Sequence, residues 1–202
     1  MFWFWWGWSS KSKKSWPNDT GIRASKHFEL TAKKVKTFNS IPEAVSKSNI
    51  VVATSVRRRE LSIPLINFEE IDKLKAKKIT ILFGQENNGL SNKEISYANY
   101  ILTIPTQKSK SLNLSHSVAV VAYMLSRSTK VVEKTNVKNS LKSQDIEKFI
   151  SYLMQILENR RFTTIKSKTH NLELSLRSFL KTSKVDQKML KTAYGVIKNL
   201  TK

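Results

Sequence analysis

Three short and continuously apolar segments recur along the middle of the chain. They read NIVVAT at 49–54, KITILFG at 78–84 and YILTIP at 100–105. Strands buried on both faces show such unbroken apolar runs, whereas half-exposed strands alternate apolar with polar residues. The pattern therefore predicts three central strands of a parallel sheet, with Val35–Phe38 as a shorter strand candidate.

Helix signals lie between these strands. Ser40 and Ser91 each stand three residues before a glutamate, which is the spacing of a capping box, and they predict helices that start after Ser40 and over 91–99. A short helix is predicted over 68–74. Residues 112–127 predict a long helix with one apolar face, formed by Leu114, Val118, Val121 and Leu125.

The segment Arg57–Ile66 carries three consecutive arginines and Pro64, and it predicts a loop. Strands that alternate with helices and are apolar throughout are typical of a sheet covered on both faces. We therefore expect an α/β fold of the doubly wound kind.

The pattern changes after about Thr129. Residues 130–143 are polar and lack a clear period, which indicates a linker. Helical periodicity returns at 144–158, 172–180 and 186–200, with Asp186 as the expected N-cap of the last helix. Residues 141–202 hold 13 basic and 5 acidic residues. We expect four segments: an atypical Trp- and Lys-rich N-terminus (1–14), the α/β domain (15–129), the linker (130–143) and a small basic helical extension (144–202).

Charge narrows the range of partners. The chain has 202 residues, with 36 Lys and Arg against 15 Asp and Glu, a formal net charge of +21. Such a field attracts polyanions, chiefly nucleic acid or an anionic membrane surface. The abundance of lysine is also what an AT-rich genome would produce. No cysteine is present, which excludes a disulfide scaffold and a thiolate metal site, and three separated histidines argue against a histidine metal site.

The first eight residues, MFWFWWGW, hold four of the five tryptophans and are followed by SSKSKKS. A secretory signal has its positive charge first and a longer apolar stretch, so this order does not fit one. We expect a non-native or frayed end outside the fold, with an interfacial membrane anchor as the alternative. No apolar run approaches the ~20 residues of a membrane helix, so a cytoplasmic protein is expected.

Two segments carry candidate chemistry. Gly84 ends a predicted strand and opens FGQENNGL, at the sheet edge where α/β proteins bind ligands. Glu86 is then an acid over the crevice; an exposed glutamate in a plain strand-to-helix turn is equally compatible with the spacing. The second segment, IPTQKSKSLNLS, runs from Ile104 into a helix N-terminus with Ser111 and Asn113. Locally, Ser111 as a simple helix cap is the better interpretation. No GxGxxG or P-loop motif is present.

Together, LFGQENNGLSNKE at 82–94 and IPTQKSKSLNLSHSVAVVAYML at 104–125 resemble the SpoU/TrmH branch of the SPOUT RNA methyltransferases. The stretches Trp16-Pro17-Asn18 and VVATSVRRRE at 51–60 are similar to the TrmJ-like subfamily of tRNA 2′-O-methyltransferases. The resemblance implies a SPOUT-type parallel sheet whose C-terminal part forms a trefoil knot, a homodimer, and methyl transfer from S-adenosyl-L-methionine to a ribose 2′-hydroxyl of tRNA, in the anticodon loop, without a metal.

The resemblance also implies roles for individual residues. Those expected to contact the methyl donor are Thr54, Ser55, Val56, Gly84, Ile104, Ser111, Leu112 and Asn113. Those at the positions of the catalytic motifs are Glu86, Ser111 and Asn113. Much of the donor contact would be made by backbone, with Ile104 and Leu112 against the adenine. Arg57, Arg58 and Arg59, with the lysines of the extension, are expected to bind tRNA.

One departure from the family pattern opens a second hypothesis. The first motif of the family, Asn-x-Gly followed by an arginine on a helix, lies upstream of the Trp-Pro-Asn stretch, and here no Asn or Arg precedes Asn18. We therefore expect the first strand and helix of the family domain to be missing. The alternative function is a SPOUT relic that binds RNA without methylating it.

Overall fold

The computed structural model describes residues 36–55, 63–74, 76–106, 111–127, 141–162, 165–183 and 185–201. Its centre is a sheet of four parallel strands in the order β2-β4-β1-β3. The strands are β1 (Ile50–Thr54), β2 (Leu65–Ile66), β3 (Ile79–Leu82) and β4 (Tyr100–Leu102). The predicted α/β class and parallel sheet are confirmed.

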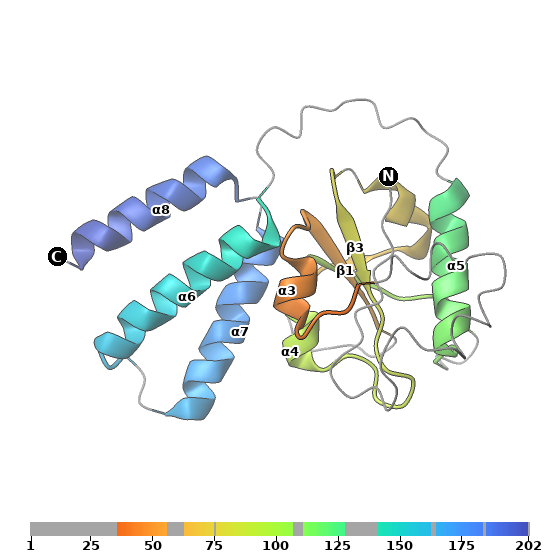
Figure 1. The fold of residues 1–202 in the computed structure, drawn as a ribbon, viewed down its shortest axis with the longest axis horizontal. Helices are drawn as coiled ribbons and strands as arrows, with labels where there is room; N and C mark the ends of the chain where they lie inside the picture. The colour runs from red at the N-terminus through yellow and green to blue at the C-terminus, as the bar shows by residue number, and fades with distance from the viewer. Residues whose placement is uncertain are drawn as a thin grey trace.

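Helices cover both faces of this sheet. On one face lie α3 (Ile41–Val45) and α4 (Asn92–Ile95), and on the other lies α5 (Leu114–Arg127) beside a 3₁₀ helix, η2 (Phe68–Lys73) (Figure 1). Beyond α3 and α4 lies a unit of three helices, α6 (Ser143–Asn159), α7 (Lys166–Thr182) and α8 (Gln187–Leu200). We call these three helices the helical unit.

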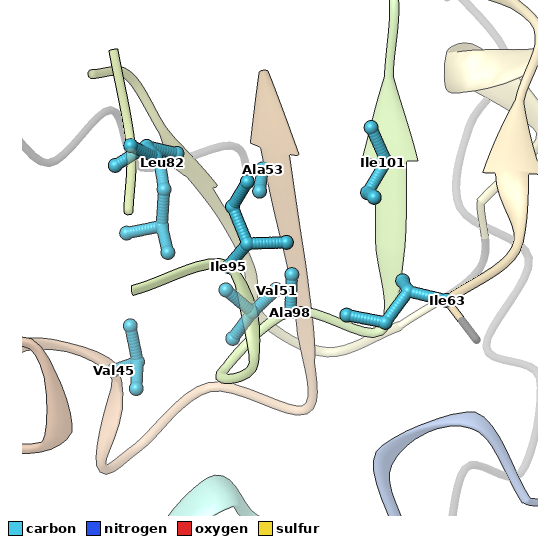
Figure 2. Close-up of a cluster of buried hydrophobic side chains, with 9 residues drawn as sticks. Val45, Val51, Ala53, Ile63, Leu82, Ile95, Ala98 and Ile101 are labelled. Carbon is cyan, nitrogen blue, oxygen red and sulfur yellow. The ribbon is translucent and has the colours of Figure 1, made fainter. Parts of the chain in front are cut away.

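Successive side chains of a strand point to opposite faces of the sheet, and each face has its own hydrophobic core. Val51 and Ala53 of β1 point to the face of α3 and α4, where they pack with Ile95 and Ile101 (Figure 2). Val52, between them in sequence, packs on the opposite face with Val121 and Leu125 of α5, among others. This is the period of two expected of a strand, and it explains why a strand between two helical layers is apolar at every position.

Several predicted boundaries are wrong in detail. Residues 36–38 form no strand, and Leu65–Ile66, predicted as loop, is the edge strand β2. The predicted helix over 91–99 ends at Ile95, because the backbone N–H of Asn99 donates to Val51 O (2.7 Å) and its side-chain Oδ1 accepts from Val51 N (2.8 Å). These bonds turn the chain into β4.

Helix starts agree better with the sequence. Ser91 and Glu94 form the predicted capping box of α4, and Asp186 caps α8 by accepting from Met189 N. Ser40 caps α3 by accepting from Glu43 N, but the Glu43 carboxylate reaches back one residue further than predicted, to Asn39 N (3.1 Å). The expected atypical N-terminus (1–14) and most of the expected linker (130–140) lie outside the described residues.

The helical unit joins the sheet layer through buried polar groups. The Arg177 side chain is 3% exposed; its Nε lies 3.1 Å from Glu147, its Nη2 2.6 Å from Glu173, and its guanidinium carbon 4.4 Å from the centre of the Tyr97 ring. The Asn99 side chain donates to Lys181 O (2.7 Å). The two glutamates, which belong to the helical unit, compensate the buried charge of Arg177. The contacts with Tyr97 and Asn99 join the unit to the sheet layer.

None of the helices in the described ranges has the length and hydropathy that a membrane span requires.

Candidate functional site

A cavity opens where β1, β3 and β4 end and their following loops begin. Ligands of parallel α/β sheets bind at this edge, because the strand ends leave a crevice there. The walls come from the end of β1, the loop after β3, and the segment between β4 and α5. The lining residues are Thr54, Ser55, Phe83, Gly84, Gln85, Glu86, Asn87, Asn88, Gly89, Leu90, Leu102, Ile104, Thr106, Ser111, Leu112, Leu114 and Ser117.

Hydrogen bonds hold the three strand ends in register. Ser55 N donates to Leu102 O (3.0 Å), so β1 remains paired with β4 to its end. The Thr54 hydroxyl donates to Leu82 O (3.0 Å) on the other side, at the end of β3. The ends of β1, β3 and β4 are therefore held side by side where the cavity opens.

The loop after β3 folds back on itself. Gly89 N donates to Gln85 O (2.8 Å), and Gly89 has a φ of +66°, which favours glycine. A Cβ placed on Gly84 would lie 2.4 Å from the carbonyl carbon of Gly89. The backbone approach at Gly84 leaves no room for a Cβ, and the dihedral angle at Gly89 favours glycine.

The segment before α5 corrects one expectation. The helix begins at Leu114, and its cap is Asn113, whose Oδ1 accepts from Ser115 N (2.9 Å) and from the Ser115 hydroxyl (2.5 Å). The carbonyl of Asn113 accepts the first helical bond, from Ser117 N (2.9 Å). Ser111 is not the helix cap that its local pattern favoured. Its exposed hydroxyl lies 3.4 Å from Leu112 O and lines the cavity.

Asn113 also connects the two motif segments. Its side-chain nitrogen donates to Glu86 Oε1, across 27 positions of sequence. The same amide thus caps α5 with its oxygen and holds the glutamate of the β3 loop with its nitrogen. Glu86 is the one charged residue among the lining residues of this cavity, within the part of the chain that the structure describes.

Most of the predicted site residues gather here. Those that line the cavity are Thr54, Ser55, Gly84, Glu86, Ile104, Ser111 and Leu112, and Asn113 contacts it through Glu86. Val56, Arg57, Arg58 and Arg59 lie outside the described residues.

Other lining residues of the cavity were not among the predicted site residues. Phe83 and Leu90 flank the glycine loop, Thr106 follows β4, and Ser117 lies one helical turn after Asn113. Their nearness to strand ends and to the first turn of α5 was the available signal. Helix periodicity alone assigned Leu114 to the apolar face.

The lining of this cavity combines aliphatic side chains, hydroxyl groups and a carboxylate. Aliphatic side chains at Ile104 and Leu112 provide an apolar wall, and hydroxyls at Ser111 and Thr106 provide donors and acceptors. Glu86 supplies one carboxylate, which attracts a cationic group and can accept a proton. Among the described residues, no group of three or more His, Cys, Asp or Glu side chains is placed to hold a metal ion.

Known proteins give the context for this geometry. The model of the SpoU rRNA Methylase family matches residues 10–123. The tRNA (cytidine/uridine-2′-O-)-methyltransferase TrmJ of Photorhabdus laumondii is 27% identical over 175 residues, covering 81% of this chain and 72% of that protein. The tRNA (cytidine-2′-O-)-methyltransferase TrmJ of Methanocaldococcus jannaschii is 36% identical over 117 residues, covering 54% of this chain and 51% of that protein. The chain thus spans from about half to 72% of these relatives.

Solved structures agree with the sequence comparison. The crystal structure of TrmJ from Z. mobilis ZM4 superposes with a TM-score of 0.83 at 25% identity, covering 93% of this chain and 83% of that one. A probable methylase family protein from Haemophilus influenzae gives a TM-score of 0.51 at 27% identity, covering 92% of this chain and 82% of that one. With the family model matched over more than half of its length, this chain belongs to the SpoU family of RNA methylases.

Proposed function

We propose that this protein transfers the methyl group of S-adenosylmethionine to a ribose 2′-hydroxyl of tRNA. The observation that carries the proposal is the contact between Asn113 and Glu86, which unites two motif segments in one cavity. The relatives named tRNA 2′-O-methyltransferases and the net charge of +21 support tRNA as the substrate.

The chemistry of the lining residues supports S-adenosylmethionine as the methyl donor. Ile104 and Leu112 offer apolar surface for a flat adenine ring, and Ser111 offers a hydroxyl for polar substituents. Ser55 and Gly84 line the same cavity at the strand ends. The carboxylate of Glu86 is opposite in charge to a sulfonium and would attract it. The donor itself supplies an activated methyl group on that sulfonium.

The residues of the chain then have to prepare the hydroxyl. A ribose 2′-hydroxyl is a poor nucleophile until its proton is accepted, and in this proposal the Glu86 carboxylate, which lines the cavity, accepts it. Asn113 holds that carboxylate in one orientation, and the Ser111 hydroxyl can donate to the acceptor ribose. Alignment of the reacting groups supplies a large part of the rate in such a transfer.

Wider features of the family extend the proposal. We infer that the segments after β3 and β4 form the trefoil knot, that two copies assemble into a homodimer, and that the acceptor lies in the anticodon loop. A cytoplasmic location belongs to the same inference. Similarity to the SpoU family and to the TrmJ structure supports these points.

The direct test is transfer of isotopically labelled methyl groups to tRNA. We expect label in tRNA, recovered as 2′-O-methylated nucleosides after nuclease digestion. Label on a base, or label in a ribosomal RNA fragment but not in tRNA, would reject the proposal as stated. A catalytically impaired chain gives a third pattern: salt-sensitive tRNA binding with no label. The same experiment separates this alternative from methyl transfer.

A further inference from the structure

One end of the helical unit points away from the sheet (Figure 1). Its residues include exposed basic and apolar side chains. It is built from the end of α6, the start of α7 and the end of α8. We call it the helical tip, and it comprises Arg160, Arg161, Phe162, Lys168, Lys198 and Leu200. One acidic side chain, Glu158, is exposed beside it in the last turn of α6.

One hydrogen bond organises the helical tip. Arg160 Nη2 donates to Leu200 O (2.9 Å), so the arginine that ends α6 satisfies a carbonyl at the end of α8. Helix ends leave such carbonyls without partners, and a cation is favourable there. The two helix ends are therefore held together, and the neighbouring Arg161 and Phe162 occupy a defined place.

Arg161 stands where a glycine is normally found. Phe162 N donates to Leu157 O (2.9 Å) and Arg161 N to Glu158 O (2.9 Å), which is the Schellman pattern at a helix end. The residue at Arg161 must then be left-handed, and its φ is +52°. Among the described residues, it is the one non-glycine residue with a positive φ. Glycine would adopt this conformation without strain, so stability does not explain the arginine.

Phe162 is also unusual, because its side chain is 65% exposed at a turn between two helices. An apolar side chain at this position ordinarily packs back against the helix. Within the described residues, Arg161, Lys168 and Lys198 form no ion pair, so their charges are available to an external anion. Proteins commonly bind single-stranded RNA through an aromatic side chain near cationic side chains. The base stacks on the ring and the phosphate contacts the cation.

We propose that the helical tip is a second RNA contact, in which Phe162 stacks on an unpaired base and Arg161 holds a neighbouring phosphate. An anionic phosphate matches the charge, and a guanidinium binds phosphate through two parallel hydrogen bonds. This inference rests on the proposed function, because it takes tRNA as the ligand. The ends of α6 and α8 lie apart from the sheet (Figure 1), whose strand ends line the cavity. The helical tip is therefore expected to contribute to RNA affinity and not to the chemical step.

The test uses the full chain and a matched pair of phenylalanines. Phe162 is 65% exposed at the helical tip, and Phe179 is 64% exposed near the other end of α7. Dissociation constants for tRNA are measured by fluorescence anisotropy for Phe162→Ala and Phe179→Ala. Loss of one stacked base weakens binding at least about fivefold. We expect that loss for Phe162→Ala, and no more than about a twofold change for Phe179→Ala.

Arg161→Gly separates the RNA role from a structural role. Glycine relieves the left-handed strain, so the melting temperature should stay level or rise. The affinity for tRNA should nevertheless fall, and the slope of log affinity against log salt should flatten by about one. In methyl transfer, both tip variants should raise KM for tRNA and leave kcat unchanged. If Arg161→Gly raises the melting temperature and still weakens tRNA binding, partial unfolding cannot explain the weaker binding.

The outcomes distinguish the two proposals. If the wild-type chain binds tRNA and Phe162→Ala binds as tightly as Phe179→Ala, the helical tip is not an RNA contact, whatever the enzyme does. If Phe162→Ala weakens tRNA binding while the wild-type chain transfers no methyl group, RNA binding by the helical tip is supported and the proposed methyl transfer is rejected. A loss of binding to anionic phospholipid vesicles in Phe162→Ala, with tRNA binding intact, would overturn the inference in favour of a membrane contact.

Discussion

The side-chain amide of Asn113 joins two segments that are far apart in sequence: its oxygen caps α5 and its nitrogen donates to the carboxylate of Glu86. Each function of this amide can be removed separately. Serine is as good a helix cap as asparagine, but it has no amide nitrogen to offer Glu86. The pair therefore permits a test in which the fold is kept and the site is altered.

We predict that Asn113→Ser retains the stability of the chain and lowers kcat at least about tenfold, because the carboxylate loses its fixed orientation. Asn113→Ala should lower kcat equally and also lose about 1 kcal/mol of stability with the cap. Rates come from labelled methyl transfer and stabilities from urea unfolding. Normal turnover in Asn113→Ser would show that the contact with Glu86 has no part in the reaction.

Glu86→Gln tests the carboxylate itself. Glutamine keeps the size of the side chain and can still contact Asn113, but it cannot accept a proton or attract a cation. We expect methyl transfer to fall at least about a hundredfold, in line with the loss of a general base. Because Glu86 is exposed, the unfolding free energy should change by less than about 0.5 kcal/mol. Activity near the wild-type level would remove Glu86 from the mechanism.

Two glycines make an internally controlled comparison. A methyl group at Gly84 would lie 2.4 Å from backbone, whereas one at Gly195 meets nothing within 4 Å. Gly84→Ala should therefore destabilise the chain by about 1–3 kcal/mol. Gly195→Ala, in the interior of α8, should stabilise it by about 0.5–1 kcal/mol. Thermal or urea unfolding measures the change in stability for each variant. Equal changes in the two variants would contradict the tight backbone contact at Gly84.

The buried Arg177 should matter far more than an exposed ion pair. Burial disfavours its charge, but Glu147 and Glu173 more than compensate and raise the pKa of Arg177 above its ordinary value. Arg177→Met leaves Glu147 without its partner, and we expect a loss of about 3–5 kcal/mol. The control is Lys73→Met, which removes an exposed pair with Glu70 and should change stability by less than about 1 kcal/mol. Similar losses in the two variants would contradict the description of the Arg177 contact.

Lys181 predicts a pH dependence. Burial lowers its pKa from 10.5 to about 8, with Glu147 opposing the shift and Arg177 adding to it. Between these two values the unfolded chain binds more protons than the folded chain, so folding stability rises with pH. From pH 7 to 9.5, the wild type should gain about 2 kcal/mol relative to Lys181→Met. Parallel stability curves for the two proteins would show that Lys181 is not buried as a charged group.

The sequence predicted those features that depend on local chemistry. Continuous apolar runs identified β1, β3 and β4, and polar residues at strand ends predicted that Gly84, Glu86, Ile104 and Ser111 share one edge. Other features depend on distant partners. β2 has only two residues and exists because it pairs with β4. Ser111 and Asn113 are both suitable caps, and position 113 also places the amide against Glu86, which no local pattern reveals.

The docking of the helical unit was equally hidden. Arg177 and Lys181 fit the pattern of surface positions on a basic helix, yet both are almost fully buried against the sheet layer. Their burial follows from groups contributed by other elements, such as Tyr97, Ser143 and Glu147. Periodicity within one helix cannot identify partners on other elements. The sequence therefore indicated a helical extension without indicating that it packs against the sheet layer.

Titration of the wild-type chain with S-adenosylmethionine in a calorimeter tests the central claim most directly. One donor bound per chain, with binding lost in Gly84→Ala and kept in Gly195→Ala, is the result expected of a single cavity made by the loops after β3 and β4. Heat no greater than that of dilution for the wild type, or equal binding by both glycine variants, would contradict the claim that S-adenosylmethionine binds in the cavity at the strand ends.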